Sequence, residues 1–366
     1  MLTALKNAAN LVAFFLTLPV VIIYRFLLSF FVTQQRSKPW RRVVGDEAFR
    51  WFLRTQNIPF IATLFGSSHG AYVKWCKKSA IEPRIEQINC EAQIFWVGEE
   101  DCDRVILYLH GGGFSLPLTD YSMSFWKFVV DMLQEVEGLK VRLAMLDYTL
   151  VPDGSFPVPL CQTVEAVNHL LRQGVKPENI QLTGDSAGGN LLNQFFLHML
   201  HPVEGVPLVK PGVRFKGAYF MSPWPFLLPR VGVESYTDNS QHDIVSPPEK
   251  FADFGRRVLS GLQNEAVDLP YVDASYAPDG WYEDYDDLVE SVLITAGGAE
   301  CLKDDILEFA DILGKAHKDT KLVVDRFGVH DDPFLDFLVG EKRLTELTPL
   351  IIQWVADRFQ SSNTGM

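Results

Sequence analysis

Cysteine is scarce in this sequence, and the few cysteines show no recognised pattern. Five occur among 366 residues, and no two of them form a C-x-x-C pair or another zinc-binding spacing. An odd, scattered set in a chain of this length is not a disulfide framework. We therefore expect no metal site, and free thiols that lie mostly in the core, at Cys76, Cys90, Cys102, Cys161 and Cys301.

Basic residues are also in short supply, with 33 Lys and Arg against 46 Asp and Glu and a formal net charge of −13. Binding to a nucleic-acid backbone depends on Lys and Arg, so this balance argues against nucleic acid as a partner. The chain is 47% hydrophobic and 22% charged, which is enough to bury a large core and excludes wholesale disorder. The length fits two domains or one large α/β domain.

The first 45 residues contain no Asp or Glu at all. They hold six basic residues, which leaves 27 basic and 46 acidic residues, a net charge of −19, in the rest of the chain. Within this head, the 23 residues from Leu11 to Thr33 are interrupted by a single charge, Arg25. A helix of that length reaches roughly 35 Å, against a hydrocarbon core of about 30 Å.

The apolar side chains of this run outweigh the cost of inserting Arg25, which is roughly 2.5 to 3.5 kcal/mol at mid-membrane. No small-x-small cleavage site follows the run. We predict that residues 1–45 form an uncleaved membrane anchor; a buried or interfacial helix kinked at Pro19 is the alternative. Four basic residues after the run outweigh Lys6 before it, so the positive-inside rule places the body in the cytosol. The lack of any N-x-S/T glycosylation acceptor agrees with that placement.

Residues 46–360 alternate short apolar runs with longer helical patterns, which predicts a mostly parallel sheet covered by helices on both faces. The fold class is therefore doubly wound α/β. We expect the aromatic segments 46–95 and 223–280 to form cap or lid elements, and residues 361–366 to form a polar tail. The expected strands are Arg104–His110, Val141–Tyr148, Ile180–Gly184, Phe215–Ser222, Ser291–Ala296 and Lys321–Phe327. After two or three short helices in residues 46–80, the expected helices are Ser122–Val136, Leu160–Gln173, Ala187–Leu200, Asp304–His317 and Glu341–Phe359.

Residues 184–188 read GDSAG and fit the pattern G-x-S-x-G. The pattern follows a strand-like run and opens a helix-like one, which is the strand-to-helix turn that pushes a serine outward. Ser186 is therefore the candidate nucleophile; a plain glycine-rich turn is the alternative reading.

Residues 110–113 read HGGG and follow another predicted strand. Three glycines leave backbone N–H groups free to meet an oxyanion. By the arrangement found in HGGG-type esterases, Gly112 and Gly113 would act together with the N–H of Ala187. A phosphate-binding loop is the rival, but no phosphate-loop pattern can be drawn here. We expect His110 to organise the loop rather than to act as a base.

A base and an acid should follow the serine in the order Ser, acid, His. His330 lies in a loop after a strand, where α/β sheets gather their sites, whereas His317 closes a helical stretch and is expected to face solvent. Glu300 lies in a loop after a strand, whereas Asp304 falls in the first turn of a helix, where acids are favoured by the helix dipole. We predict Ser186, Glu300 and His330 as a catalytic triad, with Asp304 kept open as the acid.

On these motifs the chain resembles the hormone-sensitive-lipase-like branch of the α/β hydrolases, the fold-3 group. Four blocks carry the resemblance: HGGGF at His110, DYTLVPDGSFPVPL at Asp147, GDSAGGN at Gly184, and the pair GGAECLKDD and GVHDDPF near the end. Members commonly carry Asp where this chain has Glu300. The N-terminal run and the E-x-L-x-D-D acid block are also similar to fungal steryl acetyl hydrolases, which implies attachment to the endoplasmic reticulum with a lumenal body.

The motifs and the resemblance together predict a serine hydrolase of carboxylic esters that needs no cofactor. The aromatic segments and the apolar head favour a lipophilic alcohol, and the resemblance implies a short acyl group, a sterol acetate being the first choice. An amidase, deformylase or acyltransferase could use the same triad. A binding protein on a hydrolase scaffold is the rival from another class, and the presence of His330 argues against it.

Overall fold

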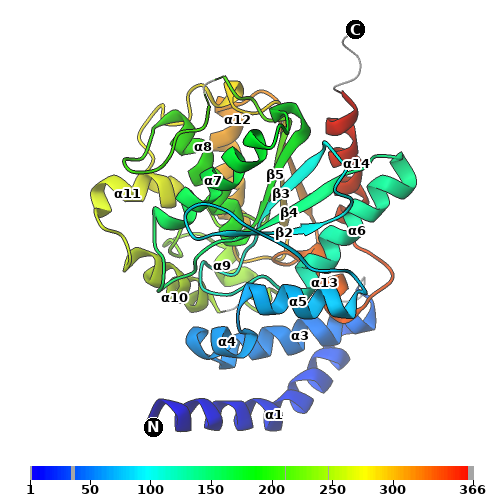
Figure 1. The fold of residues 1–366 in the computed structure, drawn as a ribbon. Helices are drawn as coiled ribbons and strands as arrows, with labels where there is room; N and C mark the ends of the chain where they lie inside the picture. The colour runs from blue at the N-terminus through cyan, green and yellow to red at the C-terminus, as the bar shows by residue number, and fades with distance from the viewer. Residues whose placement is uncertain (1, 34–37, 211, 246, 362–366) are drawn as a thin grey trace.

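The computed structural model describes residues 2–33, 38–210, 212–245 and 247–361. In this described part of the chain one sheet of eight strands runs through the molecule, in the order β1-β2-β4-β3-β5-β6-β7-β8 (Figure 1). The strands are β1 (Arg84–Gln87), β2 (Gln93–Val97), β3 (Val105–Leu109), β4 (Arg142–Asp147), β5 (Ile180–Asp185), β6 (Gly217–Met221), β7 (Val292–Gly297) and β8 (Thr320–Asp325).

From β3 to β8 all neighbouring strands are parallel, so their carboxyl ends meet at one edge of the sheet. Helices cover both faces. The helices α7 (Val158–Arg172), α8 (Ser186–Leu200) and α12 (Lys303–Ala316) lie on one face, and α6 (Asp120–Glu137) and α14 (Leu347–Gln360) lie on the other. Within the described residues, three short 3-10 helices complete the connections, at Pro177–Asn179, Ala274–Tyr276 and Tyr285–Asp287. The predicted α/β hydrolase architecture is confirmed.

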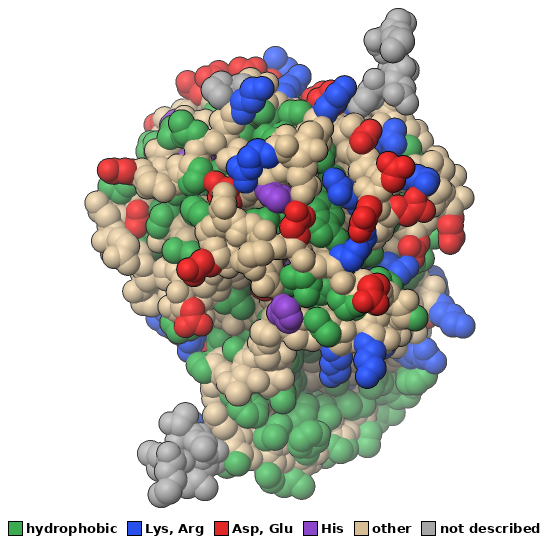
Figure 2. All heavy atoms as spheres, viewed as in Figure 1, with side chains coloured by type: hydrophobic (Ala, Val, Ile, Leu, Met, Phe, Trp, Pro, Cys, Tyr) green, Lys and Arg blue, Asp and Glu red, His purple; other side chains and the backbone are tan. Residues whose placement is uncertain are grey.

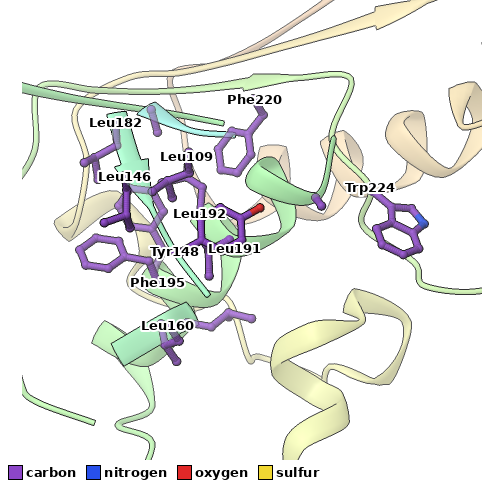
Figure 3. Packing of buried hydrophobic residues seen from close by; sticks show 14 of the residues in the cluster. Leu109, Leu146, Tyr148, Leu160, Leu182, Leu191, Leu192, Phe195, Phe220 and Trp224 are labelled. Atoms are coloured by element: carbon purple, nitrogen blue, oxygen red, sulfur yellow. The ribbon is translucent and has the colours of Figure 1, made fainter. Parts of the chain in front are cut away.

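Strand β3 shows why both faces are apolar. Leu107 and Leu109 point into the cluster shared with α7, α8 and α12, whereas Ile106 and Tyr108 join the cluster shared with α6 and α14. All four side chains are buried, which produces a continuous apolar run instead of an alternating one. Figure 3 shows the first cluster, in which side chains of α8 such as Leu191 and Phe195 pack beside Leu109 and Leu146.

Two features of the sheet and its cover differ from the prediction. Strands β1 and β2 precede the strand expected at Arg104 and pair antiparallel at the edge of the sheet, so the predicted cap segment 46–95 contains sheet strands. Strand β1 was missed because its four residues alternate half-buried and exposed and offer no apolar run. The helix expected from Glu341 begins only at Leu347, because a separate helix α13 (Asp332–Val339) ends at the left-handed Gly340.

The N-terminal layer consists of α1 (Leu2–Ser29), α3 (Trp40–Thr55), α4 (Ile58–Phe65) and α5 (Ser68–Lys78). Helix α1 lies along α3 below the body (Figure 1). Phe14 contacts Phe52 edge to face at 5.7 Å, and Arg25 pairs with the buried Glu47 at 3.2 Å. The boundary predicted between residues 45 and 46 therefore falls inside α3.

Arg42, on α3, joins the N-terminal layer to the body. Its buried guanidinium pairs with Asp46 at 2.9 Å, with Asp332 at 2.9 Å and with Asp336 at 2.5 Å. Burial alone would raise the pKa of Asp332, but Arg42 and Lys38 hold that pKa down at about 2. Two residues of α13 thus depend on a cation from the chain's first 45 residues.

The long segment 223–280 carries α9 (Ser235–Asp238), α10 (Pro248–Leu259) and α11 (Glu265–Val272). Its buried aromatic residues, among them Trp224, Phe251 and Tyr271, belong to the same hydrophobic cluster as the sheet. The segment therefore extends the main core.

Candidate active site

Ser186 stands on a sharp turn between β5 and α8. Its φ of 49° lies in the left-handed region, which is strained for a residue with a side chain. The flanking glycines make the turn possible, because a Cβ at Gly184 would lie 2.3 Å from the carbonyl oxygen of Gly188. A Cβ at Gly188 would lie 2.0 Å from the carbonyl oxygen of Leu109. The local geometry thus matches the strand-to-helix turn expected for GDSAG.

The structure brings together the three residues that the sequence predicts as a triad. His330 Nε2 lies 2.9 Å from Ser186 Oγ, and His330 Nδ1 lies 3.0 Å from Glu300 Oε2. Glu300 is completely buried, and its other carboxylate oxygen accepts the N–H of Gly297 at 2.8 Å. A serine, an imidazole and a carboxylate in this order can pass a proton from the serine to the imidazole.

Asp304, the alternative acid, lies outside this relay. It stands in the first turn of α12 and accepts the N–H of Ser235 at 2.9 Å. Its neighbour Asp305 pairs with Arg230 at 2.7 Å and accepts from Tyr236 Oη at 2.6 Å. The geometry therefore favours Glu300, as expected from its place in the loop.

The glycine-rich loop after β3 lies beside Ser186. Gly112 and Gly113 both line the cavity at the serine and have φ values of 102° and 61°. Asp185 Oδ1 ties this loop to the serine turn, because it accepts the N–H of Gly111 at 3.0 Å and Tyr108 Oη at 2.6 Å. Ala187 lies in the first turn of α8, where backbone N–H groups lack partners within the helix.

The two other histidines considered from the sequence take structural positions. His110 Nδ1 lies 2.8 Å from the carbonyl oxygen of Gly111, and its ring stacks on Tyr148 at 4.4 Å. Burial lowers the pKa of His110 to about 4, so the ring is neutral, in keeping with the expected loop-organising role. The expectation that His317 faces solvent is wrong: it is buried and contacts Thr320 Oγ1 at 3.0 Å and the carbonyl oxygen of Val289 at 3.1 Å.

Asp243 was missed by the sequence reasoning. This completely buried carboxylate comes from segment 223–280. Oδ1 accepts the N–H of His330 at 3.0 Å, and Oδ2 accepts the N–H of Cys301 at 2.7 Å. One side chain thus holds the backbones of both loops that carry Glu300 and His330. No local motif marks it, since its partners are 58 and 87 residues away.

Asp331 is a second acid that the sequence reasoning did not single out. It lines the cavity next to Ser186, with Oδ2 3.4 Å from His330 Nε2. Burial lowers the pKa of His330, but the acidic neighbours Asp331, Glu300 and Asp243 outweigh burial and raise the pKa above its ordinary value. Burial also raises the pKa of Asp331 well above its usual value. The imidazole therefore has a second carboxyl group within reach, Asp331, in addition to Glu300.

The cavity at Ser186 has a volume of about 90 Å³. Pockets for drug-sized ligands are larger, roughly 300 to 1,000 Å³. Aromatic side chains from the N-terminal layer and from segment 223–280 form much of its wall. Phe251 meets the His330 ring edge to face at 5.8 Å. The wall residues that these segments contribute include Phe49, Leu53, Phe65, Trp224, Phe251 and Phe254.

The chain belongs to the alpha/beta hydrolase fold family, whose model matches residues 106–334. This result confirms the resemblance inferred from the motifs. A bacterial esterase of the hormone-sensitive lipase family has the same fold, with a TM-score of 0.65 and 20% identity over 89% of this chain and 99% of its own.

Three of the relatives have names that state ester hydrolysis. A Schizosaccharomyces pombe protein with the provisional name steryl acetyl hydrolase is 24% identical over 243 residues, 65% of this chain and 62% of its own. Neutral cholesterol ester hydrolase 1 of Rattus norvegicus is 28% identical over 176 residues, 42% of this chain and 41% of its own. An esterase of Acinetobacter venetianus is 26% identical over 57% of this chain and 60% of its own. The chain thus spans less than two thirds of each of these relatives.

Proposed function

We propose that the protein is a serine hydrolase of carboxylic esters. The observation that carries the proposal is the continuous contact from Ser186 Oγ through the His330 ring to Glu300, with distances of 2.9 and 3.0 Å. The family and the names of the relatives support the same reaction class.

In the proposed reaction Ser186 Oγ attacks the acyl carbon while His330 Nε2 takes its proton. The bond to the alcohol then breaks, and His330 gives that proton to the leaving oxygen. Water, deprotonated by the same imidazole, releases the acyl group as a carboxylic acid and restores the serine. Glu300 keeps Nδ1 protonated and the ring oriented. The N–H groups of Gly112, Gly113 and Ala187 would bind the oxyanion that forms on the acyl carbonyl.

For the substrate we propose a short acyl ester of a lipophilic alcohol, with a sterol acetate as the first choice. The cavity of about 90 Å³ suits a short acyl group better than a long chain. Its aromatic wall favours an apolar partner, and two relatives carry names that state sterol ester hydrolysis. Apolar pockets discriminate by roughly 1 to 3 kcal/mol per methylene, so the preference should be graded.

We also propose that α1 attaches the protein to a membrane. Residues 6–29 are apolar enough to cross a bilayer, with a mean hydropathy of 2.4. Large apolar side chains along α1 and just after it are more than half exposed, among them Phe15, Leu16, Ile23 and Phe31. Figure 2 shows hydrophobic side chains gathered at the lower end of the molecule, over the N-terminal layer. Because α3 and α4 of this layer also line the cavity, attachment would bring the cavity close to lipid-soluble esters.

Two experiments test these proposals. A fluorophosphonate probe should label the native protein and fail to label Ser186→Ala; labelling of neither would indicate a binding protein on a hydrolase scaffold. For the substrate, the measurement is kcat/KM in matched detergent. A sterol acetate should give a higher kcat/KM than a sterol oleate, and also a higher kcat/KM than a small water-soluble acetate. Faster cleavage of the oleate would contradict the substrate proposal and leave the ester hydrolase in place.

The attachment has its own test. Full-length protein should sediment with membranes and resist washing with high salt and with carbonate. Release by salt alone would mean that α1 is held on the surface largely by charge.

A further inference from the structure

The sequence predicts free thiols that lie mostly in the core, but only two of the five cysteines are buried. Cys76 and Cys301 are core residues, but Cys90 is exposed and Cys161 is partly exposed. Cys90 lies in the turn between β1 and β2, and Cys161 lies in the first half of α7. The two sulfur atoms meet at a distance of 2.7 Å although 71 residues separate them in the chain.

Hydrogen bonds on both sides hold the two segments against each other. Gln162 Nε2 donates to the carbonyl oxygen of Cys90 at 2.9 Å. Asn89 Nδ2 donates to Glu165 Oε2 at 3.0 Å. These two hydrogen bonds hold the β1–β2 turn against α7 without any contribution from the sulfur atoms. The contact between the thiols is a consequence of this docking.

We propose that Cys90 and Cys161 form a disulfide bond when the protein is exposed to an oxidising thiol environment. A bonded pair has sulfur atoms about 2.05 Å apart, so closure needs an approach of only about 0.7 Å. The bond closes a loop that contains β2, β3, α6 and β4 and fastens the edge of the sheet to α7.

The oxidant is a disulfide, either of an oxidoreductase or of glutathione. The exposed Cys90 thiolate attacks one sulfur of that disulfide, and one donor thiolate leaves. Cys161 then loses its proton, attacks the mixed disulfide at the Cys90 sulfur and releases the second donor thiolate. Two protein thiols are oxidised, and one donor disulfide is reduced to two thiols. Cys90 is the more exposed of the two thiols, and burial raises the pKa of Cys161, so Cys90 is the first attacker.

The proposed bond also has a consequence for membrane topology, which depends on the proposed membrane attachment. Disulfides persist in oxidising compartments and are rare in the cytosol. A membrane-attached protein with this bond has its body on the lumenal or outer side, opposite to the side that the charge count favours. That count included Lys38 and Arg42, which the structure pairs with Asp46 and Asp332, so these two charges serve the fold of the body.

The bond itself is tested on purified full-length protein in detergent. The protein is equilibrated in a glutathione buffer with the oxidised fraction of a secretory compartment, alkylated in denaturant and digested without reductant. We expect one linked peptide pair containing Cys90 and Cys161, with Cys76, Cys102 and Cys301 alkylated. Recovery of Cys90 and Cys161 in alkylated form would overturn the proposal.

Variants give a second measurement that does not depend on peptide recovery. Reductant should lower the Tm of the parent protein by about 5 °C or more. Cys90→Ser and Cys161→Ser should have this lower Tm in both buffers, whereas the control Cys102→Ser should respond to reductant like the parent. An equal response of all four proteins would overturn the bond. Ester hydrolysis should persist in every variant, so a failure here is distinct from a failure of the proposed reaction.

The side of the membrane on which the body lies is tested in microsomes. Intact microsomes are treated with a membrane-permeant maleimide before lysis, and the full-length protein is then digested without reductant. A linked pair of Cys90 and Cys161 supports a lumenal body. Maleimide on both cysteines overturns that placement, while the glutathione experiment decides on the bond independently.

Discussion

The carboxyl edge of the sheet and the N-terminal layer touch each other but are built in opposite ways. At the edge Ser186, Glu300 and His330 are each less than a tenth exposed and are held by hydrogen bonds of about 3 Å. In the layer, α1 leaves most of its apolar side chains exposed and makes few polar contacts with α3. Chemistry at the edge should therefore be sensitive to single atoms, whereas changes in the layer should act mainly on stability and attachment.

The largest effect is expected from the proposed triad. Ser186→Ala and His330→Ala should each lower kcat by about a millionfold, and the double variant should be scarcely worse because the two residues act as a unit. The measurement is kcat on a small acetate, with circular dichroism as the check on folding. Losses that multiply in the double variant would contradict a shared proton relay.

The acid comes next and has a matched control on the same stretch of chain. Glu300→Gln should cost about ten-thousandfold in kcat, because an amide no longer fixes the tautomer of His330. Asp304→Asn should change kcat little, since Asp304 contacts Ser235 and not His330. The reverse ranking would move the acid to Asp304.

The contact between the two regions can be tested by removing Arg42, which joins them. A chain that begins at Asp46 lacks Arg42 and leaves Asp332 and Asp336 without their cation, which should cost about 3 to 5 kcal/mol of folding free energy. A chain that begins at Lys38 keeps these ion pairs and should remain folded in detergent. Denaturant unfolding of the two truncated chains measures the difference. Equal stability would mean that the buried carboxylates find other partners.

Substitution of Asp243 should misplace His330 and slow the reaction without abolishing it. In Asp243→Asn the amide hydrogens would face the N–H of His330 or of Cys301, and the displaced histidine should cost about a hundredfold in kcat with little change in KM. The control is Asp268→Asn, a buried acid that also accepts backbone N–H groups, from Gln263 and Asn264, away from the triad. A similar loss in both variants would indicate a general effect on stability.

The smallest effect concerns pH. The Asp331 carboxylate stabilises the protonated imidazole and so raises the pKa of His330. Asp331→Asn removes that charge and should lower the pKa. The base works in its neutral form, so the acid limb of the profile of kcat/KM against pH should move to lower pH. An unchanged limb would show that Asp331 is neutral throughout the working range.

How far the sequence predicts this molecule also differs between the two regions. The six strands expected between Arg104 and Phe327 and the places of Ser186, Glu300 and His330 follow from continuous apolar runs and from glycine patterns, both of which are local signals. Asp243 and Arg42 have no such signal, because the contacts that tie them to other parts of the fold reach far along the chain, 58 residues from Asp243 to Cys301 and 294 residues from Arg42 to Asp336. The edge strand β1 was missed for a related reason. It is a strand because it pairs with β2, and its own four side chains form no apolar run that would predict it.

The ion pairs of Arg42 give the N-terminal segment a structural role in addition to the proposed membrane attachment. Asp332, which Arg42 neutralises, also accepts the N–H of Val329 at 3.0 Å, one residue before His330. Exchange of residues 1–45 for an unrelated segment would therefore also remove part of the support of the histidine. Residues 1–45 and the loop that carries His330 are therefore one structural unit, and a change in the first is expected to disturb the second.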